Sequence, residues 1–448
     1  MKHQALDPAA RHGRQRPSSA LRSGLRLVAA IAAVGVVSVG SLGAIASWEV
    51  LRDAKPTVSL AMGGTPAKAA PQLTAQRGEV NMLLVATDTR TGQGAGFEDA
   101  RNLAAASGVG HNDSNLLVHI SADHTHMAVI SFPRDLEIPI PACENDQGTV
   151  TPASSKAMLN TALGRGGEKH GLACVAKTLD QLTGVQIGYA GMITFDGVVA
   201  MADAIGGVKV CLATPIQDNA VTPAINLPAG NQELHGAEAA AFLRIRDGVG
   251  DASDLGRISN QQTFMAALAR QTVSSHTLTD PTKVLRLAST AAKHMTLSDT
   301  LADPTTLARL ALAVNTVGLQ NMTFVQYPVA DDPVDRNRVI VSQSAAQTLN
   351  AVLQADQPVV LGAGSLGRAA VRDPSAPAAS APAASAPAAS APAAGSAPAA
   401  NGASGGSAAA GQPSGAASPA AGTGAAPAPL PDSVSGQSAA TVTCAAKR

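Results

Sequence analysis

Short apolar runs alternate with stretches of helical periodicity through the middle of this 448-residue chain. The run 80–86 (VNMLLVA) predicts a buried strand, and 114–135 predicts a hairpin, because two apolar stretches flank the polar segment ADHTH. Helical periodicity is found in 261–315 and in the adjoining ALAVNTVGLQ, and MTFVQYPV (322–329) and VKVCL indicate further strands. This mixture predicts a single α/β domain over 79–361, with a central mixed sheet flanked by helices.

The N-terminal region has a different pattern. Residues 1–26 carry six basic side chains and one acidic side chain, and an uncharged run of 22 residues follows over 27–48. At about 1.5 Å per residue this run spans the roughly 30 Å hydrocarbon layer of a membrane. We expect a basic cytoplasmic segment, a retained transmembrane helix, a linker over 49–78, and a domain outside the cytoplasm. The alternative is a cleaved signal peptide, since AIA at 44–46 resembles a cleavage site.

The C-terminal region, 362–448, is rich in Ala, Pro, Ser and Gly and contains five SAPAA repeats between 375 and 400. Such a segment lacks the large apolar side chains that offset the entropy of ordering. We therefore expect a disordered tail. Outside the cytoplasm disulfides persist, and we expect Cys143 to pair with Cys174 and Cys444 to be free.

The overall charge excludes one class of partner. Lys plus Arg equals Asp plus Glu, at 32 each, and the chain has only 6 Phe, 2 Tyr and 1 Trp. Nucleic-acid binding requires a basic surface, usually with aromatic side chains on which bases stack. We expect no nucleic-acid partner.

Charged side chains follow the ends of the predicted strands. Asp88 lies just after the first strand, Asp113 just before the hairpin, and Arg134 just after it. If the strands are antiparallel neighbours, these three side chains emerge at the same edge of the sheet. Two carboxylates and one guanidinium group would then meet there.

A second group of charges lies in AAFLRIRDGVGDASDLGRISNQQ, residues 240–262. Its relevant members are Arg244, Arg246, Asp254, Arg257 and Gln261. The two arginines at 244 and 246 would share a face if a strand follows the helix, and the other three lie on one stripe of the next helix. Converging guanidinium groups hold phosphate oxygens two at a time. The alternative is a set of local salt bridges, Arg246 with Asp247 and Asp254 with Arg257, which contribute little to stability.

Taken together, these segments resemble the LytR–CpsA–Psr family of bacterial envelope proteins. The matching pieces occur in the family's order over roughly 80–265: LLVATDTR, HNDSNLLVHISADH, VISFPRD, LNTALGRGG, LDQLTGV, DAIGGVKVCL, LPAGNQELHGAEAAAFLRIR and SDLGRISNQQ. The resemblance implies an α/β fold with an apolar pocket for a polyprenyl chain. It also implies transfer of a glycopolymer, as sugar phosphate, from a polyprenyl pyrophosphate carrier to a hydroxyl of peptidoglycan at the cytoplasmic membrane.

The resemblance also assigns residues. The family's metal-binding aspartates fall on Asp88 and Asp113, which would hold Mg²⁺ or Mn²⁺. The implied pyrophosphate-binding and catalytic side chains are Arg134, Arg244, Arg246, Asp254 and Arg257. Gln261 belongs to the same site, Arg90 in TDTR is a further substrate-binding candidate, and Asp113 or Asp254 would accept the proton of the attacking hydroxyl.

The chain departs from the family pattern at His111 and Asn260, where arginines are usual. The loss of two positive charges would weaken pyrophosphate binding or change the preferred donor. Two other functions are therefore kept beside the transferase: a polyprenyl-pyrophosphate hydrolase that uses the same site with water as acceptor, and a non-enzymatic envelope scaffold.

Overall fold

The protein is described here from a computed structural model, in residues 57–60, 76–89, 108–221, 223–274, 280–362, 364–376 and 428–447. All of them belong to one compact unit within 55–448. The basic segment 1–26 and the predicted transmembrane run 27–48 lie outside the described residues. Within the described part of the chain, no helix combines the length and the apolar character needed to cross a membrane.

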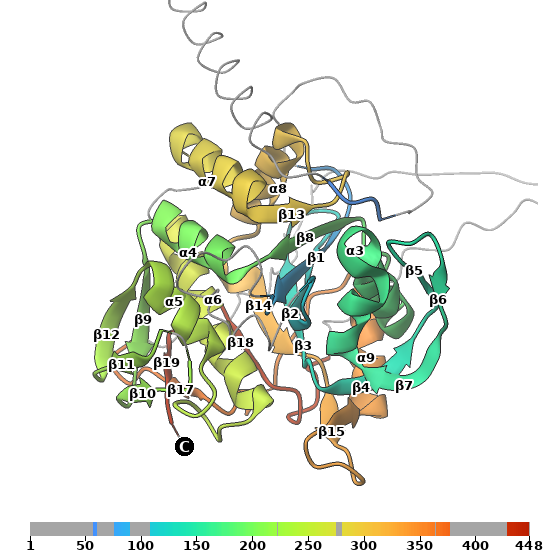
Figure 1. Ribbon diagram of the computed structural model, residues 1–448. Helices are drawn as coiled ribbons and strands as arrows, with labels where there is room; N and C mark the ends of the chain where they lie inside the picture. Colours follow the sequence, from blue (N-terminus) through green and yellow to red (C-terminus); the bar gives the residue numbers. More distant parts are fainter. Residues whose placement is uncertain are drawn as a thin grey trace, which may run out of the picture. The chain divides into compact units, whose positions relative to one another are not determined.

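The centre of the fold is a seven-stranded mixed sheet (Figure 1). Its strands, in order across the sheet, are β13 (Met295–Leu297), β8 (Tyr189–Ile193), β1 (Val80–Thr87), β2 (Asn112–Ile120), β3 (Met127–Phe132), β14 (Met322–Gln326) and β18 (Gly436–Ser438). β1, β2 and β3 are consecutive antiparallel neighbours, whereas β8 is parallel to β1 and β14 is parallel to β3. The predicted α/β class, the first strand and the hairpin are confirmed.

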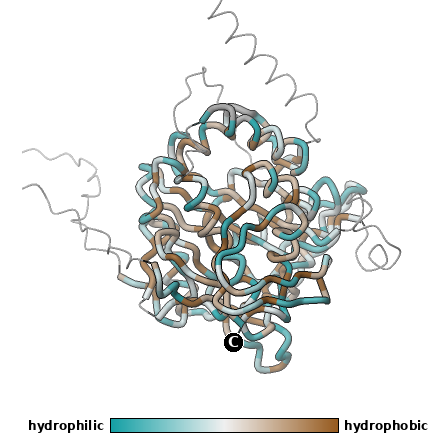
Figure 2. Tube along the Cα trace, turned by 90° about the vertical axis from the view of Figure 1, so that its left-hand side faces the viewer, coloured by the Kyte–Doolittle hydropathy of each residue, from teal (hydrophilic) through white to brown (hydrophobic). Residues whose placement is uncertain are grey.

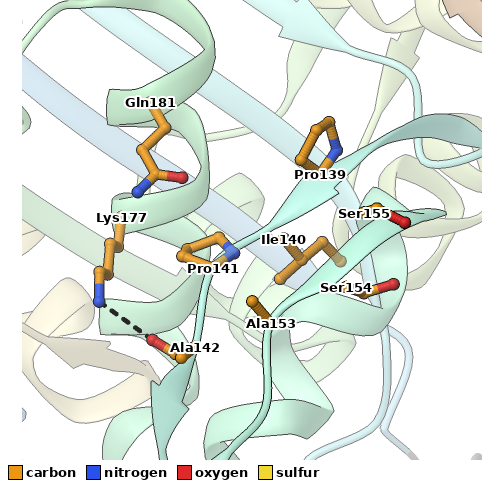
Figure 3. Close-up of a pocket in the computed structure, with 9 residues that line it drawn as sticks. All are labelled: Pro139, Ile140, Pro141, Ala142, Ala153, Ser154, Ser155, Lys177 and Gln181. Carbon is orange, nitrogen blue, oxygen red and sulfur yellow. Dashed lines mark hydrogen bonds between the residues drawn. The ribbon is translucent and has the colours of Figure 1, made fainter.

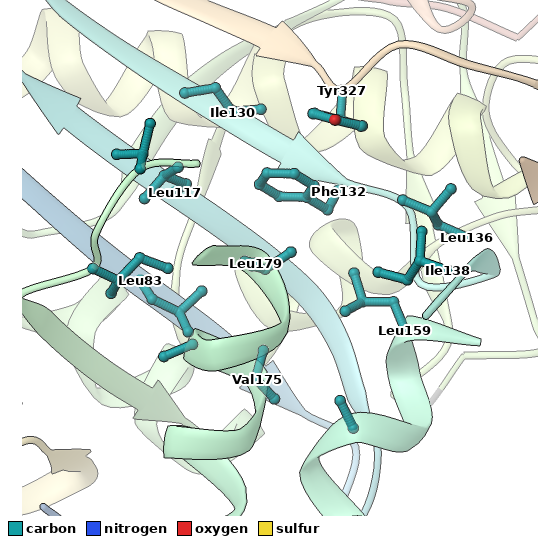
Figure 4. Packing of buried hydrophobic residues seen from close by; sticks show 14 of the residues in the cluster. Leu83, Leu117, Ile130, Phe132, Leu136, Ile138, Leu159, Val175, Leu179 and Tyr327 are labelled. Atoms are coloured by element: carbon teal, nitrogen blue, oxygen red, sulfur yellow. The ribbon is translucent and has the colours of Figure 1, made fainter. Parts of the chain in front are cut away.

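Helices cover both faces of this sheet (Figure 1). On one face, α3 (Ala162–Thr183) and α9 (Gln343–Gln354) pack over fully buried side chains such as Leu83 and Leu117. Figure 4 shows this cluster, in which the rings of Phe132 and Tyr327 stack with their centroids 4.8 Å apart. The other face packs against α6 (Asp254–Ser274) and α8 (Pro304–Val317). The period-two alternation of the strands explains this division, because successive side chains point to opposite faces.

A four-stranded sheet forms a second core beside the central one. Its strands are β12 (Gly230–Leu234), β9 (Val208–Leu212), β19 (Thr443–Ala445) and β17 (Ala370–Arg372). They pack against α5 (Gly236–Arg244) and α6, so that α6 contacts both cores. Figure 2 shows the same fold turned by 90°, with hydrophilic residues on several of its outer loops.

The remaining elements extend these two cores. They are β4 (Leu136–Ile140), β5 (Cys143–Glu144), β6 (Val150–Thr151), β7 (Ser154–Met158), α4 (Phe195–Ala204), β10 (Ile216–Asp218), β11 (Ile225–Leu227), α7 (Pro281–His294), β15 (Val329–Asp331) and β16 (Val339–Val341), with short 3₁₀ turns at Leu159–Thr161 and Leu319–Asn321. β15, β16, β4 and β7 form a separate four-stranded sheet. Helices α6, α7 and α8 confirm the predicted helical region, which β13 interrupts.

The predicted linker over 49–78 is wrong for 57–60. The backbone of Val58 forms hydrogen bonds with Leu297 and Asp299, and the side chains of Val58 and Leu60 are buried in the main core. Two apolar residues at alternate positions are enough to extend the edge of a sheet. The partner lies more than two hundred residues later, so no local pattern around Val58 indicates it.

The predicted disordered tail is wrong for 364–376 and 428–447. β17 lies in the first of these segments, and β18 and β19 lie in the second, where β18 pairs with β14 of the central sheet. β19 pairs with both β9 and β17. Composition misled the prediction because short strands bonded to existing sheet edges need few apolar residues of their own. Residues 377–427, which include most of the repeats, lie outside the described residues.

Two disulfides connect distant parts of the chain. Cys143 pairs with Cys174, as predicted, whereas Cys444 is bonded to Cys211 across 233 residues and is not free. The second bond joins paired residues of β19 and β9. It therefore fastens the C-terminal strand to the second core.

We expect the double substitution Cys211→Ser and Cys444→Ser to lower the free energy of unfolding by about 2–4 kcal/mol, because the bond restricts the unfolded chain over a long loop. Urea unfolding of the oxidised chain, compared with the variant, measures the difference. An unchanged unfolding midpoint would show that β19 does not depend on this bond.

Candidate active site

A bulge at the start of β2 places the first carboxylate of the site. The β1–β2 register pairs Ala86 with Ser114 and then Thr87 with Asn112, so Asp113 is the extra residue on β2. An extra residue of this kind redirects a side chain out of the ladder. Asn112 is fully buried, and its amide bonds the Leu159 carbonyl, which holds the bulge against the rest of the fold.

The strand directions bring the three predicted side chains to one edge. β1 ends immediately before Asp88, and β2 begins beside Asp113. β3 returns to the same edge, since Phe132 pairs with Asn115, and Arg134 follows two residues later. The Nη1 atom of Arg134 donates a hydrogen bond to Oδ2 of Asp113 at 2.8 Å. The predicted convergence of Asp113 and Arg134 is thus confirmed in detail.

The first turn of α6 delivers the second guanidinium group to this edge. Arg257 Nη2 lies 2.6 Å from Oδ1 of Asp254, its partner one helical turn earlier, and donates to the backbone carbonyl of Asp113 at 2.8 Å. Arg134 Nε lies 3.6 Å from the same Asp254 oxygen. The side chains of Asp254 and Arg257 are each only 7% exposed. One carboxylate therefore lies between two arginines in a largely desolvated position.

Burial and charge act against each other within this group, as the pKa values show. Burial, opposed by the Asp254 carboxylate, lowers the pKa of Arg257, and the neighbouring Arg134 lowers it further. Burial also acts to lower the pKa of Arg134, but three surrounding carboxylates more than compensate and raise it above its ordinary value. For Asp135, burial and then the nearby Asp254 raise the pKa. Like charges thus lie close together here, an arrangement frequent at functional sites.

Several polar atoms of this group are buried without a hydrogen-bond partner. They are Oδ1 of Asp113, Nε of Arg134, Nε of Arg257 and both carboxylate oxygens of Asp254. Among them, Nε of Arg134 and Oδ1 of Asp254 make ion-pair contacts. Buried polar atoms are nearly always satisfied in proteins. Unsatisfied hydrogen-bond donors and acceptors on four residues that are neighbours in space indicate a binding site for a polar ligand.

Asp88 is fixed by a tight turn beside it. Its Oδ1 accepts a hydrogen bond from the backbone N–H of His111 at 2.6 Å, and its Oδ2 lies 3.8 Å from the His111 ring. Gly110 has a φ of +72°, and a Cβ at this position would lie 2.8 Å from Oδ1 of Asp88. His111, at a position where the resemblance predicts an arginine, has an exposed side chain beside the first predicted metal ligand.

The structure corrects the expected position of Arg244 and Arg246. No strand follows α5, because the helix ends at Arg244 and a turn begins just after Ile245. Arg246 nevertheless lies within electrostatic range of Asp135 and Arg257, so it faces the site from this loop. Arg244 is half-buried in the last turn of α5. Of the two local salt bridges considered, only Asp254 with Arg257 is present among the described ion pairs.

Two neighbouring amides attach α5 to α6. Gln261 Nε2 donates to the carbonyl of Leu243 at 3.0 Å, and Asn260 Nδ2 donates to that of Phe242 at 2.8 Å. Helix ends leave carbonyl groups unsatisfied, and these amides bond two of them. Asn260, where the family has an arginine, is fully buried and holds the helices together. The substrate contact expected of Gln261 remains a prediction.

Sequence reasoning missed two contributors. Asp135 lies 3.5 Å from Nε of Arg134, and the only signal for it was its position next to that arginine in the sequence. Asn112 fixes the bulge, and its role depends on a partner 47 residues away. Arg90 lies outside the described residues.

A recess of about 740 Å³ lies elsewhere on the domain (Figure 3). Its lining residues are Pro139, Ile140, Pro141, Ala142, Ala153, Ser154, Ser155, Lys177 and Gln181. Lys177, on α3, donates to the Ala142 carbonyl at its rim. Arg134 precedes β4, whereas the recess begins at the other end of that strand, so the recess is separate from the charged site.

The predicted metal ligands suit a hard divalent cation. Asp113 Oδ1 is a buried carboxylate oxygen without a partner, and Mg²⁺ prefers such oxygens together with water and substrate phosphates. Neither Asp88 nor Asp113 belongs to a described group of three or more metal-ligating side chains. A metal held by these two aspartates would therefore draw its other ligands from substrate and solvent.

Several known proteins with related sequences have names that refer to cell-wall biosynthesis. The chain is 28% identical to the cell wall biosynthesis protein LcpA of Corynebacterium glutamicum, over 68% of this chain and 60% of LcpA. It is 25% identical to the polyisoprenyl-teichoic acid–peptidoglycan teichoic acid transferase TagT of Bacillus subtilis, over 58% of this chain and 73% of TagT. Among solved structures, a LytR-Csp2A-Psr enzyme from Actinomyces oris matches at 20% identity with a TM-score of 0.45, over 67% of this chain and 95% of that chain.

The family match covers the whole site. The model of the LytR_cpsA_psr family matches residues 52–355, which include both aspartates, the arginines and all of α6. This segment is more than half of the chain, and it agrees with the order of motifs found in the sequence. The protein belongs to the LytR–CpsA–Psr family.

Proposed function

We propose that this protein is a phosphotransferase of cell-wall assembly that moves a glycopolymer, as sugar phosphate, from a polyprenyl pyrophosphate carrier to peptidoglycan. The observation that carries the proposal is the group of buried, unsatisfied polar atoms on Asp113, Arg134, Asp254 and Arg257. The names of LcpA and TagT, which refer to cell-wall biosynthesis and to teichoic acid transfer, support the same proposal. Because the match covers 60% of LcpA, the reaction, substrates and partners are proposed for this chain on its own residues.

A diphosphate group fits the charge pattern of the site. Arg134 and Arg257 each have an Nε–H without a hydrogen-bond partner, and these donors match phosphate oxygens. Arg246 adds positive charge from the loop after α5, and the start of α6 contributes backbone N–H groups and the positive end of the helix dipole. The diphosphate would replace the carboxylates as the principal partner of the guanidinium groups.

Asp88 and Asp113 would hold Mg²⁺ or Mn²⁺ beside the diphosphate. When bound, such a cation neutralises phosphate charge and polarises the phosphoryl group under attack. The chain's own part is to hold the two carboxylates at the sheet edge, through the bulge at Asp113 and the turn at Gly110. Arg134 also orients Asp113 through its hydrogen bond.

The face of the sheet toward α6 and α8 offers a place for the polyprenyl chain. Met82, Leu84 and Leu116 on this face remain partly exposed, whereas Leu83 and Leu117 on the opposite face are completely buried. Leu116 lies three residues from Asp113, so the partly exposed apolar side chains begin close to the charged site. An isoprenoid chain would cover these side chains and gain by leaving water.

The reaction requires proton transfer and charge stabilisation rather than a covalent intermediate. The acceptor hydroxyl oxygen would attack the phosphorus next to the sugar, and the bond from that phosphorus to the bridging oxygen would break. Polyprenyl phosphate leaves, and the hydroxyl proton passes to Asp113 or Asp254. Arg134 and Arg257 would stabilise the charge that develops on the leaving phosphate.

The chemistry implies a place in the cell. The substrate is anchored in a membrane and peptidoglycan lies outside it, so we propose that the domain is extracytoplasmic and that residues 27–48 anchor it, with the N-terminus in the cytoplasm. The two disulfides support an oxidising compartment. A hydrolase would use the same site with water as acceptor, and a scaffold would need neither the arginines nor the metal.

We expect Arg134→Gln and Arg257→Gln each to reduce transfer about 10²–10³-fold, since each removes a donor from the developing charge. The purified chain is incubated with labelled polyprenyl-pyrophosphate-linked oligosaccharide and peptidoglycan, and label bound to peptidoglycan is measured. Arg372→Gln, at an exposed arginine on β17, is the control and should retain full transfer.

Release of free sugar phosphate whether or not peptidoglycan is present would instead identify a hydrolase. Full transfer by the Arg134→Gln variant in vitro would contradict the proposed chemistry. An intact cellular phenotype together with no measurable transfer by the wild-type chain would favour a scaffold. Circular dichroism of each variant separates loss of activity from loss of fold.

Removal of divalent cations with EDTA should abolish transfer, and addition of Mg²⁺ should restore it. Asp113→Asn keeps the shape of the side chain but removes its charge, so this variant should need a higher Mg²⁺ concentration for half-maximal transfer. The measurement is the transfer rate across a Mg²⁺ titration. A rate that does not depend on Mg²⁺ or Mn²⁺ would contradict the metal assignment.

A further inference from the structure

A second cluster of chemically active side chains lies at the other end of the central sheet. It consists of His119 near the end of β2, His126 just before β3, and Asp356 after the end of α9. One ligand atom from each of these residues lies within 4.8 Å of the others. The charged site is at the beginning of β2, so the two groups lie at opposite ends of that strand.

The hydrogen bonds of His119 determine which of its nitrogens carries hydrogen. Nδ1 lies 2.7 Å from Oδ1 of Asn81, and the other end of that amide donates to Glu79 at 2.7 Å. The amide orientation is thus fixed, and its oxygen can only accept. Nδ1 of His119 must donate, which leaves a lone pair on Nε2 of the neutral ring.

A similar chain of hydrogen bonds orients His126. The hydroxyl of Thr125 donates its only hydrogen to the Asp123 carboxylate at 2.8 Å. Its oxygen, 3.2 Å from Nδ1 of His126, therefore accepts a hydrogen bond from that nitrogen. Nε2 of His126 is then also a lone pair, and it is buried with no hydrogen-bond partner in a residue that is 8% exposed.

These assignments leave two acceptors facing each other. Nε2 of His119 lies 3.0 Å from Oδ1 of Asp356, although the neutral ring has no hydrogen at this position. A cation between them resolves the repulsion, and it is either a proton or a metal ion. His119 is completely buried, and a buried charged imidazolium is costly.

Burial acts against a charged ring at both histidines. Burial lowers the pKa of His119 despite the carboxylates of Asp356 and Glu79, and His126 lowers it further. Burial also lowers the pKa of His126, against the carboxylates of Asp356 and Asp123 and the backbone carbonyl of Gln357. The buried positions of both rings favour neutral imidazole, which is the form that binds metals.

The distances suit a first-row transition metal. Zinc binds His nitrogen and carboxylate oxygen at about 2.0–2.2 Å, which places two ligand atoms about 3–3.5 Å apart at coordination angles between 90° and 109°. The 3.0 Å separation of His119 and Asp356 already matches this value. The 4.8 Å limit on the cluster requires His126 to approach by at most about 1.8 Å when the metal binds.

We propose that His119, His126 and Asp356 form a structural site for Zn²⁺ or a similar transition metal, distinct from the magnesium site proposed at Asp88 and Asp113. Hydrogen bonds from neighbouring groups hold two of the ligands in place. Asn81 orients His119, and the N–H of Ala122 donates to Oδ2 of Asp356 at 3.0 Å. The side chain of Asp356 is 27% exposed, so a solvent molecule can complete the coordination. The bound metal would fasten the β2–β3 hairpin to the end of α9.

The test uses the whole chain without added histidines, stripped with EDTA and dialysed. Zn²⁺ is titrated by calorimetry, and Co²⁺ is added separately because its visible absorption bands report nitrogen and oxygen coordination. We expect one equivalent of either metal to bind and Zn²⁺ to raise the melting temperature. Mg²⁺ should not compete, because His-rich sites select against it.

His126→Ala and Asp356→Asn should weaken Zn²⁺ binding about 100-fold or more, since each removes a ligand. Asp356→Asn retains the oxygen that Ala122 can bond, so it should fold even if the histidine variant does not. His294→Ala is the matched control, because His294 pairs with Asp196 at 3.2 Å in a more exposed place without a second histidine.

Absence of Zn²⁺ binding and of cobalt bands in the wild-type chain would overturn the proposal and assign the cluster to a protonated histidine–aspartate pair. Wild-type affinity in the Asp356→Asn variant would also overturn it. Neither result bears on glycopolymer transfer, which the arginine variants test independently.

Discussion

The contact between Arg257 and Asp254, with Arg134 alongside, is the interaction on which the structure of the site depends. Taking these charges out of water is costly, and their mutual attraction offsets that cost only when the geometry is closely held. The fold holds it from two sides: the first turn of α6 supplies both members of the pair, and the end of β3 supplies Arg134. The carbonyl of Asp113 connects the two sides through Arg257.

Much of the surrounding structure serves to keep these elements in place. The bulge on β2 turns Asp113 toward the arginines, and buried Asn112 anchors that bulge. Gln261 and the neighbouring amide attach the end of α5 to α6, which carries Arg257. Because α6 packs against both cores, a displacement of the second sheet would reach the site through this helix. The Cys211–Cys444 bond stabilises that sheet at some distance from the chemistry.

The unsatisfied atoms of the site explain how a rigid arrangement can still bind a ligand. Asp254 and Asp113 neutralise the guanidinium groups in the free protein, yet they leave an Nε–H on each arginine unused. A diphosphate adds oxygens where donors are available, and a cation on Asp113 offsets the charge of the phosphates. Donors held in place before the substrate arrives stabilise developing charge without reorganisation.

The positions of site residues could be predicted from the sequence where they depend on neighbouring residues or on a single strand or helix. Strand alternation and direction were sufficient to place Asp88, Asp113 and Arg134 at one edge, and helix spacing was sufficient to pair Asp254 with Arg257. The prediction of an extended segment after Arg244 was wrong because the chain turns after Ile245. The spacing of residues in the sequence carries no information on that turn.

The other failures share a non-local cause. Val58, β18 and β19 are held by strands more than one hundred residues away, and Cys444 has its partner on β9. The importance of Asn112 likewise depends on the Leu159 carbonyl. Composition describes a segment by itself, whereas these segments are ordered by edges that already exist in the fold. The roles of the site residues follow from the family and from their geometry together.

The most direct measurement is a crystal structure of the protein with a short-chain prenyl pyrophosphate and Mg²⁺. The account predicts density for the diphosphate within hydrogen-bond distance of Arg134 and Arg257, with the metal at Asp88 and Asp113 and the prenyl chain over Leu84 and Leu116. Diphosphate density in the recess beside Lys177, with the arginines still paired only to carboxylates, would contradict it.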